Sequence, residues 1–500
     1  MGVFTFRKKF SKARLIVLIA VCVLAAVLIA GLIVGDYFCA KYFPEITTYM
    51  NGQGTHDEDG DTVAARSAGN KLAARVEEEG AVLLKNNGAL PLKNTKVNVF
   101  GWTSSDNGYL VQGTGSGTGA RNDTVTFMQS LKYAGCDEDT VLEYAGKADY
   151  EPGGKLAGQN PFANGETGIE YNEELAEAYA DLPYRRIEGG SYVIEAGNDK
   201  YGVYYGVQEA PESFYTSELM TNAREFSDTA IVVLGRLMGE GNDYSKYQYY
   251  PDNSYDEDRQ LLELSPDEEA MLEQASTFDN VIVILNTTNP METGFIEESK
   301  YNIDACLYIG TPGTRGALGV ADILIGDVSP SGHLSDTMAY ELSTAASYAT
   351  SGREGQGAYT DISNGQFDPR NGANRYRDYI EDIYVGYKWY ETADEMGFWD
   401  SADARERWGI ENGYDDVVQF PFGFGLSYSE FEWSVDSISP DDGATLTADG
   451  KITLNVVVKN VGDVAAKDVV QVYYSAPYYT GGIEKSSINL VAFAKSKLLE

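Results

Sequence analysis

The chain has 500 residues, of which 43% are hydrophobic and 12% aromatic, and its formal net charge is −38 at pH 7. The apolar content predicts a folded protein of two or three domains rather than a disordered one. Nucleic-acid partners are disfavoured, because so acidic a surface repels phosphate backbones. The four cysteines and two histidines show no metal-ligand spacing, so neither a zinc site nor a disulfide scaffold is predicted, and no cofactor is expected.

The N-terminus combines a basic cluster with a long apolar run. Five basic residues lie within positions 1–14, and residues 15–34 contain neither charge nor proline. Such a run is long enough to cross a bilayer as a helix, and the positive charges favour a cytoplasmic N-terminus. We expect a cytoplasmic segment over 1–14, a transmembrane helix over 15–35, a polar linker over 36–65 and the rest outside the cell membrane. A cleaved signal peptide is the alternative, although no small-x-small cleavage site precedes Asp36.

The central part of the chain alternates helix-like and strand-like patterns. The runs 229–235 and 280–286 are continuously apolar, which is typical of parallel strands covered on both faces. Between them, Ser265, Pro266 and Glu268 form a capping box with proline in the first turn, and this predicts the start of a helix. The alternation predicts the α/β fold class.

The pattern changes toward the C-terminus. Residues 346–430 are rich in Gly, Asn, Tyr and Asp, and we expect an irregular connecting region there. After Phe431, alternate residues from Ile452 to Val458 are apolar, and a second apolar run, 468–474, follows the turn signal Gly462-Asp463. This predicts antiparallel β-sandwich strands over 431–500.

Two loops carry candidate functional residues. Glu240 lies between two glycines, shortly after the predicted strand 229–235. Ligands bind at the carboxyl ends of strands in open α/β sheets, and glycoside cleavage needs one carboxylic acid and one opposing carboxylate. An exposed loop glutamate fits the same local pattern. The glycine-rich run 113–119 lies too far from the strand at 97–100 for a dinucleotide site, so it favours a loop lining a cleft.

Several motifs, in order along the chain, together resemble family 3 glycoside hydrolases. The resemblance covers about residues 66–500. It implies that family's α/β sandwich domain over 66–345 and a fibronectin type III-like domain over 431–500. The matching segments are 79–92, 113–119, 236–243, 311–316, 326–332, 381–387 and 422–428, with a further match at 458–463.

The resemblance also assigns roles to single residues. Glu240 is implied as the catalytic acid/base, with Asp243 and Glu257 as competing candidates for that role. Tyr244 stands where the family usually has arginine, which leaves the neighbouring sugar contacts open. The residues implied to bind substrate are Gly113, Gly115, Ser116, Gly117, Arg236 and Asp243.

The implied activity is that of an exo-acting retaining β-glycosidase, β-glucosidase-like, acting on a β-linked oligosaccharide or glycoside. The family's nucleophile is an aspartate of a (β/α)8 barrel, usually within Ser-Asp-Trp, and this tripeptide does not occur here. Because permuted members place the barrel last, we expect residues 1–500 to be an inactive N-terminal part ending within the fibronectin-like domain. The alternative is a non-catalytic cell-surface carbohydrate-binding or scaffold protein, and either could form a homo-oligomer.

Overall fold

The computed structural model of the chain describes Val21 and most of residues 60–500. The longer gaps are 114–123, 136–149, 157–167, 183–192, 239–246, 251–253, 350–358 and 361–374. The chain divides into two compact units, 1–68 and 69–500, and helix α2 (Gly60–Gly80) begins in the first and ends in the second. No helix within the described residues is long and apolar enough to span a membrane. The predicted transmembrane helix lies outside them except for Val21.

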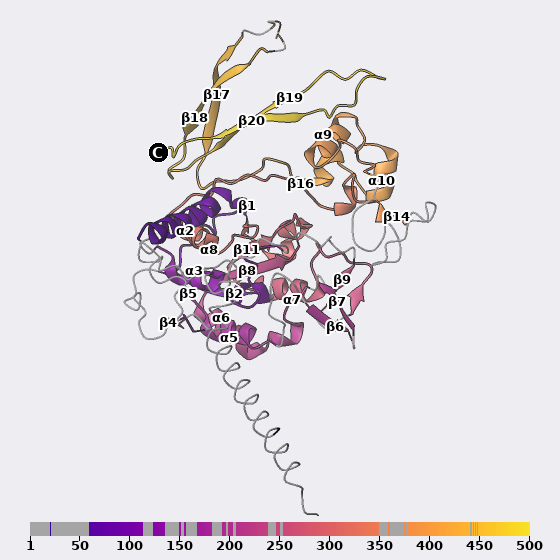
Figure 1. Ribbon diagram of the computed structural model, residues 1–500. Coiled ribbons are helices and arrows are strands. Elements are labelled where there is room, and N and C mark those ends of the chain that lie inside the picture. The colour runs from indigo at the N-terminus through magenta and orange to yellow at the C-terminus, as the bar shows by residue number, and fades with distance from the viewer. Residues whose placement is uncertain are drawn as a thin grey trace, which may run out of the picture. The chain divides into compact units, whose positions relative to one another are not determined.

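A six-stranded sheet forms the centre of the second unit (Figure 1). Its strand order is β1-β12-β11-β8-β2-β5, and β1 alone runs antiparallel to its neighbour. The strands are β1 (Val82–Asn86), β2 (Lys96–Phe100), β5 (Glu170–Tyr171), β8 (Thr229–Arg236), β11 (Asn280–Thr287) and β12 (Ala305–Tyr308). The predicted α/β fold class is therefore confirmed, and β8 and β11 are the two strands read from the apolar runs.

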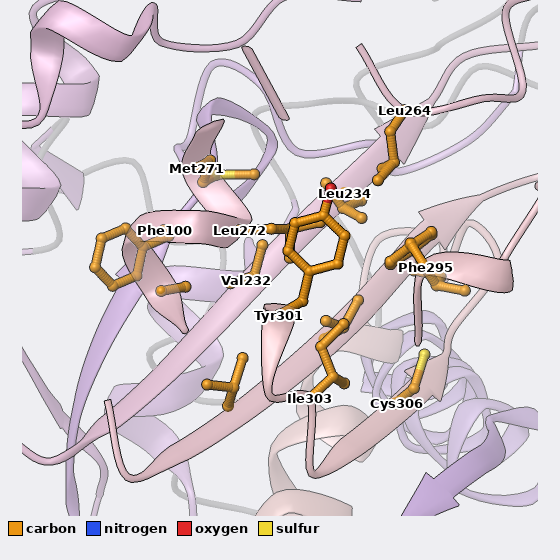
Figure 2. Close-up of a cluster of buried hydrophobic side chains, with 14 of the residues drawn as sticks. Phe100, Val232, Leu234, Leu264, Met271, Leu272, Phe295, Tyr301, Ile303 and Cys306 are labelled. Atoms are coloured by element: carbon orange, nitrogen blue, oxygen red, sulfur yellow. The ribbon is translucent and has the colours of Figure 1, made fainter. Parts of the chain in front are cut away.

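Both faces of this sheet are covered by helices. Successive residues of β8 point to opposite faces, so that Val232 and Leu234 join one core cluster while Ile231 and Val233 join the other. The first cluster (Figure 2) includes side chains of α5 (Glu173–Ala180), α6 (Ser217–Phe226) and α7 (Pro266–Ala275). The second includes side chains of α3 (Phe127–Tyr133) and α8 (Gly316–Ile325). This double burial explains why the central residues of β8 and β11, 230–234 and 281–285, are all apolar.

The capping box predicted for α7 is present. Ser265 accepts a hydrogen bond from the backbone N–H of Glu268, the Glu268 side chain accepts one from the Ser265 N–H, and Pro266 begins the helix. Pairing the first-turn N–H groups in this way stabilises the helix start. It also fixes the Glu268 carboxylate near the end of β8.

Short elements complete the unit. The two-stranded ladders are β3 (Tyr150–Glu151) with β4 (Lys155–Leu156), β6 (Val193–Ala196) with β7 (Asp199–Val203), β9 (Gln248–Tyr249) with β10 (Tyr255–Asp256), β13 (Met338–Ala339) with β16 (Val418–Phe420), and β14 (Tyr359–Thr360) with β15 (Arg375–Tyr376). The 3-10 helices are η1 (Trp102–Ser104), η3 (Glu212–Phe214), η4 (Gly294–Glu297), η5 (Ser299–Tyr301), η6 (Leu342–Thr344) and η7 (Gly413–Asp416).

The segment predicted to be irregular contains two helices, α9 (Tyr387–Glu395) and α10 (Ala402–Trp408). They are organised around Trp399, which is fully buried and packs against the rings of Trp389 and Trp408. An aromatic cluster holds these short helices together, and such contacts leave no repeating apolar pattern in the sequence. The structure therefore differs from the prediction here, because tertiary packing decides the local conformation.

The C-terminal strands form two antiparallel pairs, as their alternating pattern predicts. β17 (Phe431–Ser439) pairs with β18 (Thr453–Asn460), and β19 (Val469–Tyr474) pairs with β20 (Asn489–Lys495). Lys467 and Lys495 both form ion pairs with Glu79 at the end of α2. These contacts connect the strands to the α/β part of the same unit.

Helix α2 carries a buried acid that makes stability depend on pH. The Glu77 side chain is 9% exposed, its Oε1 atom has no hydrogen-bond partner, and burial raises the pKa of the carboxyl to about 8. The ordinary value for glutamate in an unfolded chain is about 4.3. The folded state thus favours the protonated acid. The contribution of this carboxyl to the free energy of unfolding is fully present below about pH 4 and is lost as the pH rises toward 8.

We therefore expect Glu77→Gln, which is similar in size and uncharged, to stabilise the fold in alkaline solution. We compare the unfolding free energy of the variant with that of the unmodified chain at each pH. The difference in favour of the variant should be roughly 2–4 kcal/mol larger at pH 8 than at pH 5. Urea denaturation followed by tryptophan fluorescence measures this. Glu225→Gln, at an exposed position of α6, is the control and should show little change. An equal effect of Glu77→Gln at both pH values would contradict the account.

Candidate functional site

The carboxyl ends of four parallel strands, β2, β8, β11 and β12, meet at one edge of the sheet. This is the edge at which open α/β sheets bind ligands. Gly113 and Arg236, both predicted to contact substrate, lie in the loop after β2 and at the end of β8. The other predicted site residues lie outside the described residues: Gly115, Ser116, Gly117, Glu240 and Asp243.

Asn286 joins the loops along this edge. It lies near the end of β11 and is fully buried. Its Nδ2 donates to the carbonyl oxygens of Leu110 at 2.9 Å and Gly310 at 2.8 Å, and its Oδ1 accepts from the Leu110 N–H at 2.8 Å. One side chain thus fixes the loops that follow β2 and β12. Sequence analysis did not single out Asn286, although a polar residue that ends an apolar run was a usable signal.

Gly113 lies against the segment that leads to Glu240. A Cβ atom at Gly113 would be 2.4 Å from the carbonyl oxygen of Met238, closer than atoms approach without a clash. The Thr288 hydroxyl, from the loop after β11, donates to the same carbonyl oxygen at 3.4 Å. The structure therefore brings together the first glycine of the glycine-rich run and the chain two residues before Glu240.

Arg236 is buried rather than presented to a ligand. Its side chain is 1% exposed, and its guanidinium binds the Glu268 carboxylate in a bidentate pair at 2.6 and 2.7 Å. Its remaining N–H groups donate to the carbonyl oxygens of Gly235 at 2.8 Å, Leu261 at 2.5 Å and Glu263 at 2.6 Å. All five donors of the guanidinium are used within the protein. No N–H of Arg236 is left for the predicted sugar contact in this arrangement.

The backbone carbonyl oxygen of Glu263, which accepts from Arg236, also anchors the chain on the other side of Glu240. Gln248, fully buried in β9, donates from Nε2 to the Glu263 oxygen at 3.0 Å and to the Gln260 oxygen at 3.2 Å. The backbone carbonyl oxygen of Glu263 therefore accepts hydrogen bonds from both Arg236 and Gln248. The described residues that precede and follow segment 239–246 are thus held by one short stretch, residues 260–263.

Two further acids lie near this edge, Glu209, which is buried, and Glu292, which is partly buried. Burial raises the pKa of Glu209 to about 8 and that of Glu292 to about 7. Glu209 accepts from the Trp102 N–H at 3.0 Å, and Glu292 accepts from Leu342 N–H at 2.7 Å. Both carboxyls hold backbone in place. Glu257, a competing candidate for the acid/base role, is exposed. The described residues contain no cluster of His, Cys, Asp and Glu arranged to hold a metal ion.

A cavity of about 480 Å³ lies elsewhere in the unit. Ser331 and His333 line one side of it, and Val469, Leu490 and Phe493 of the C-terminal strands line the other. Neither Gly113 nor Arg236 is among its lining residues. The candidate site is therefore the carboxyl edge of the sheet and not this cavity.

The contact at Gly113 predicts a measurable cost for a side chain there. We expect Gly113→Ala to lower the unfolding free energy by about 1–3 kcal/mol, because the Met238 backbone must move to admit the methyl group. Thermal unfolding measures the effect. Gly69→Ala is a matched control, since a Cβ at this position in α2 meets nothing within 4 Å and alanine favours helix. Equal stability of the two variants would show that the Gly113 contact is not close.

Comparison with known proteins identifies the family of this fold. Residues 81–428 match the glycosyl hydrolase family 3 C-terminal domain. A β-glucosidase of Ruminococcus albus is 33% identical over 432 residues, which are 85% of this chain and 34% of that protein. The solved β-glucosidase of Paenibacillus barengoltzii has 29% identity and a TM-score of 0.60, covering 86% of this chain and 37% of that one.

A third comparison supports the same fold. β-Glucosidase 3B of Thermotoga neapolitana, solved in complex with glucose, has 24% identity and a TM-score of 0.56. The alignment covers 90% of this chain and 49% of that one. The chain spans about a third of the length of the Ruminococcus and Paenibacillus proteins.

Proposed function

Because the chain belongs to glycosyl hydrolase family 3, through the C-terminal domain at residues 81–428, we propose that it supplies the acid/base half of a retaining β-glycosidase. The substrate class is a β-linked glucoside or oligosaccharide, from which the enzyme removes the terminal sugar. The β-glucosidase names of its relatives support this class. The observation that carries the proposal is the contact between Gly113 and Met238, since it joins the starts of both segments that resemble the family's site.

Glu240 performs the proton transfers in this proposal. Its carboxylic acid protonates the glycosidic oxygen as the bond to the leaving group breaks. Its carboxylate then accepts a proton from the water that releases the sugar. The opposing nucleophile is an aspartate outside residues 1–500, and a retaining site requires the two carboxyl groups to be about 5 Å apart. Two domains must therefore close over one sugar ring.

The remaining predicted residues bind the sugar. Glycines 115 and 117 allow backbone N–H groups to come close to sugar hydroxyls, because no side chain stands between them. Ser116 and Asp243 supply hydrogen-bonding groups to those hydroxyls. Arg236 acts differently in the proposal: it holds the chain that leads to Glu240, as its five internal hydrogen bonds indicate.

We also propose that residues 15–35 anchor the protein in the cell membrane with its bulk outside. The supporting observations are the uncharged run and the basic residues before it. Protease added to intact cells should then remove the α/β domain while leaving cytoplasmic proteins whole. Protection of the domain, or a soluble form whose N-terminus lies near Asp36, would contradict the anchor.

The role of Glu240 is tested in the enzyme that includes the nucleophile domain. Glu240→Ala should lower kcat/KM about 10²–10⁴-fold for glucosides with poor leaving groups, because these need protonation as the bond breaks. Bond cleavage should suffer less with good leaving groups, and added azide should restore turnover by attacking the glycosyl-enzyme without a base. Steady-state kinetics over a series of aryl glucosides measures both effects.

Two controls accompany this experiment. Glu257→Ala, in the same part of the chain, should retain the leaving-group dependence of the parent enzyme. Residues 1–500 alone, prepared free of host glycosidases, should give no turnover. Equal losses for good and poor leaving groups without azide rescue would remove Glu240 from the role. A non-catalytic carbohydrate-binding protein would show no turnover in any form of the chain.

A further inference from the structure

The β9–β10 hairpin, which follows segment 239–246, gathers three tyrosines on one face. Side chains alternate along a strand, so Gln248 points inward while its neighbours Tyr247 and Tyr249 point to the other face. Tyr255 of β10 lies directly across the ladder from Tyr249. Its ring centroid is 5.7 Å from that of Tyr247 and 5.6 Å from that of Tyr249. We call Tyr247, Tyr249 and Tyr255 the tyrosine platform.

The platform is attached firmly to the candidate site. Gln248 on its inner side binds the carbonyl oxygens of Gln260 and Glu263, and the Glu263 oxygen also accepts from Arg236 at the end of β8. The backbone N–H of Val207 donates to the backbone carbonyl oxygen of Tyr249 at 3.0 Å. One carbonyl therefore fixes both the strand that leads to Glu240 and the hairpin that carries the tyrosines. The hairpin that carries the platform is thus connected to the end of β8 by hydrogen bonds to residues 260–263.

Ring-ring contact alone does not account for this arrangement. Cross-strand aromatic pairs stabilise hairpins, yet Tyr255 remains 51% exposed and is a large apolar group left in water. Flat aromatic rings with a hydroxyl at one end suit a ligand that has both apolar C–H faces and hydroxyl groups. The pyranose rings of a β-linked glucan have this character. The arrangement is that of a binding surface with a polar margin.

The surrounding charge narrows the class of ligand. Asp256, Glu257 and Asp258 lie beside Tyr255, and the cation next to them, Arg259, is shared between Glu269 at 2.7 Å and Asp256 at 4.0 Å, so that Glu257 and Asp258 keep their negative charge without it. Carboxylates accept hydrogen bonds from sugar hydroxyls. They repel phosphorylated or acidic ligands. The chemistry therefore selects a neutral oligosaccharide over an anionic one.

We propose that the tyrosine platform binds the sugar units of a neutral β-linked oligosaccharide beyond the unit at the cleaved bond. The inference rests on the proposed function, which it deepens by naming where the rest of the substrate lies. It makes chain length, and not the terminal sugar alone, a determinant of affinity. Tyr255 contributes most, because it is exposed and in contact with both other rings.

Calorimetric titration of the full chain with cellotetraose and with glucose tests the proposal. The chain is held in a zwitterionic detergent, since alkyl glycoside detergents would compete for the site. Cellotetraose should bind more tightly than glucose. Tyr255→Ala should weaken cellotetraose binding about three- to tenfold. Tyr255→Phe keeps the ring and should retain the affinity.

Two further variants separate loss of the aromatic ring from misfolding of the hairpin and from the removal of any exposed tyrosine. Tyr255→Leu keeps an apolar side chain in the hairpin and should lose the same affinity, which separates the aromatic face from hairpin folding. Tyr379→Ala removes a tyrosine that is 79% exposed and lies far along the chain, and it should bind as the parent does. Unchanged binding in both Tyr255→Ala and Tyr255→Leu would overturn the proposal, and so would an unmodified chain that binds cellotetraose no better than glucose.

The titration does not depend on turnover. The chain with Glu240→Ala should still bind cellotetraose, so a failed acid/base assignment leaves this result intact. Conversely, loss of the platform leaves the leaving-group test of Glu240 unchanged.

Discussion

The buried ion pair between Arg236 and Glu268 is the contact on which the rest of the site depends. Removing two charges from water is costly, and such a pair is tolerated only when every donor and acceptor around it is satisfied. Here the Arg236 guanidinium uses all five N–H groups, and Glu268 also accepts from the Ser265 N–H. The pair joins the end of β8, the first turn of α7 and residues 261–263 into one frame.

The functional features share this frame and the neighbouring strand ends. Glu263 extends it to the β9–β10 hairpin through Gln248, and Asn286 fixes the loops that follow β2 and β12. Gly113 then packs directly on Met238. Preorganised backbone at the carboxyl edge is what a positioned acid/base residue requires, because misplacement by about 1 Å can cost 10²-fold in rate. The proposed catalytic loop and the proposed sugar platform therefore begin from the same rigid support.

Some elements of this fold could be predicted from the sequence, and some of its contacts could not. Continuous apolar runs identified β8 and β11 because both faces of the sheet are buried, and Ser265, Pro266 and Glu268 marked the start of α7 because capping is local chemistry. The partner of Arg236 could not be read in the same way. Glu268 is 32 residues away along the chain, and pairing depends on where β8 and α7 meet. The helices α9 and α10 escaped prediction for a similar reason, since Trp399 joins them through tertiary contacts.

A double-mutant cycle on Arg236 and Glu268 tests the central role of the pair most directly. Arg236→Met, Glu268→Leu and the double variant are compared by urea denaturation. Each single change should cost about 3–5 kcal/mol by leaving an unpaired buried charge, and the double variant should lose far less than the sum. The partly exposed pair Arg259–Glu269, changed in the same way, should show much weaker coupling, about 1 kcal/mol or less. Losses at Arg236 and Glu268 that add within about 0.5 kcal/mol would contradict the account.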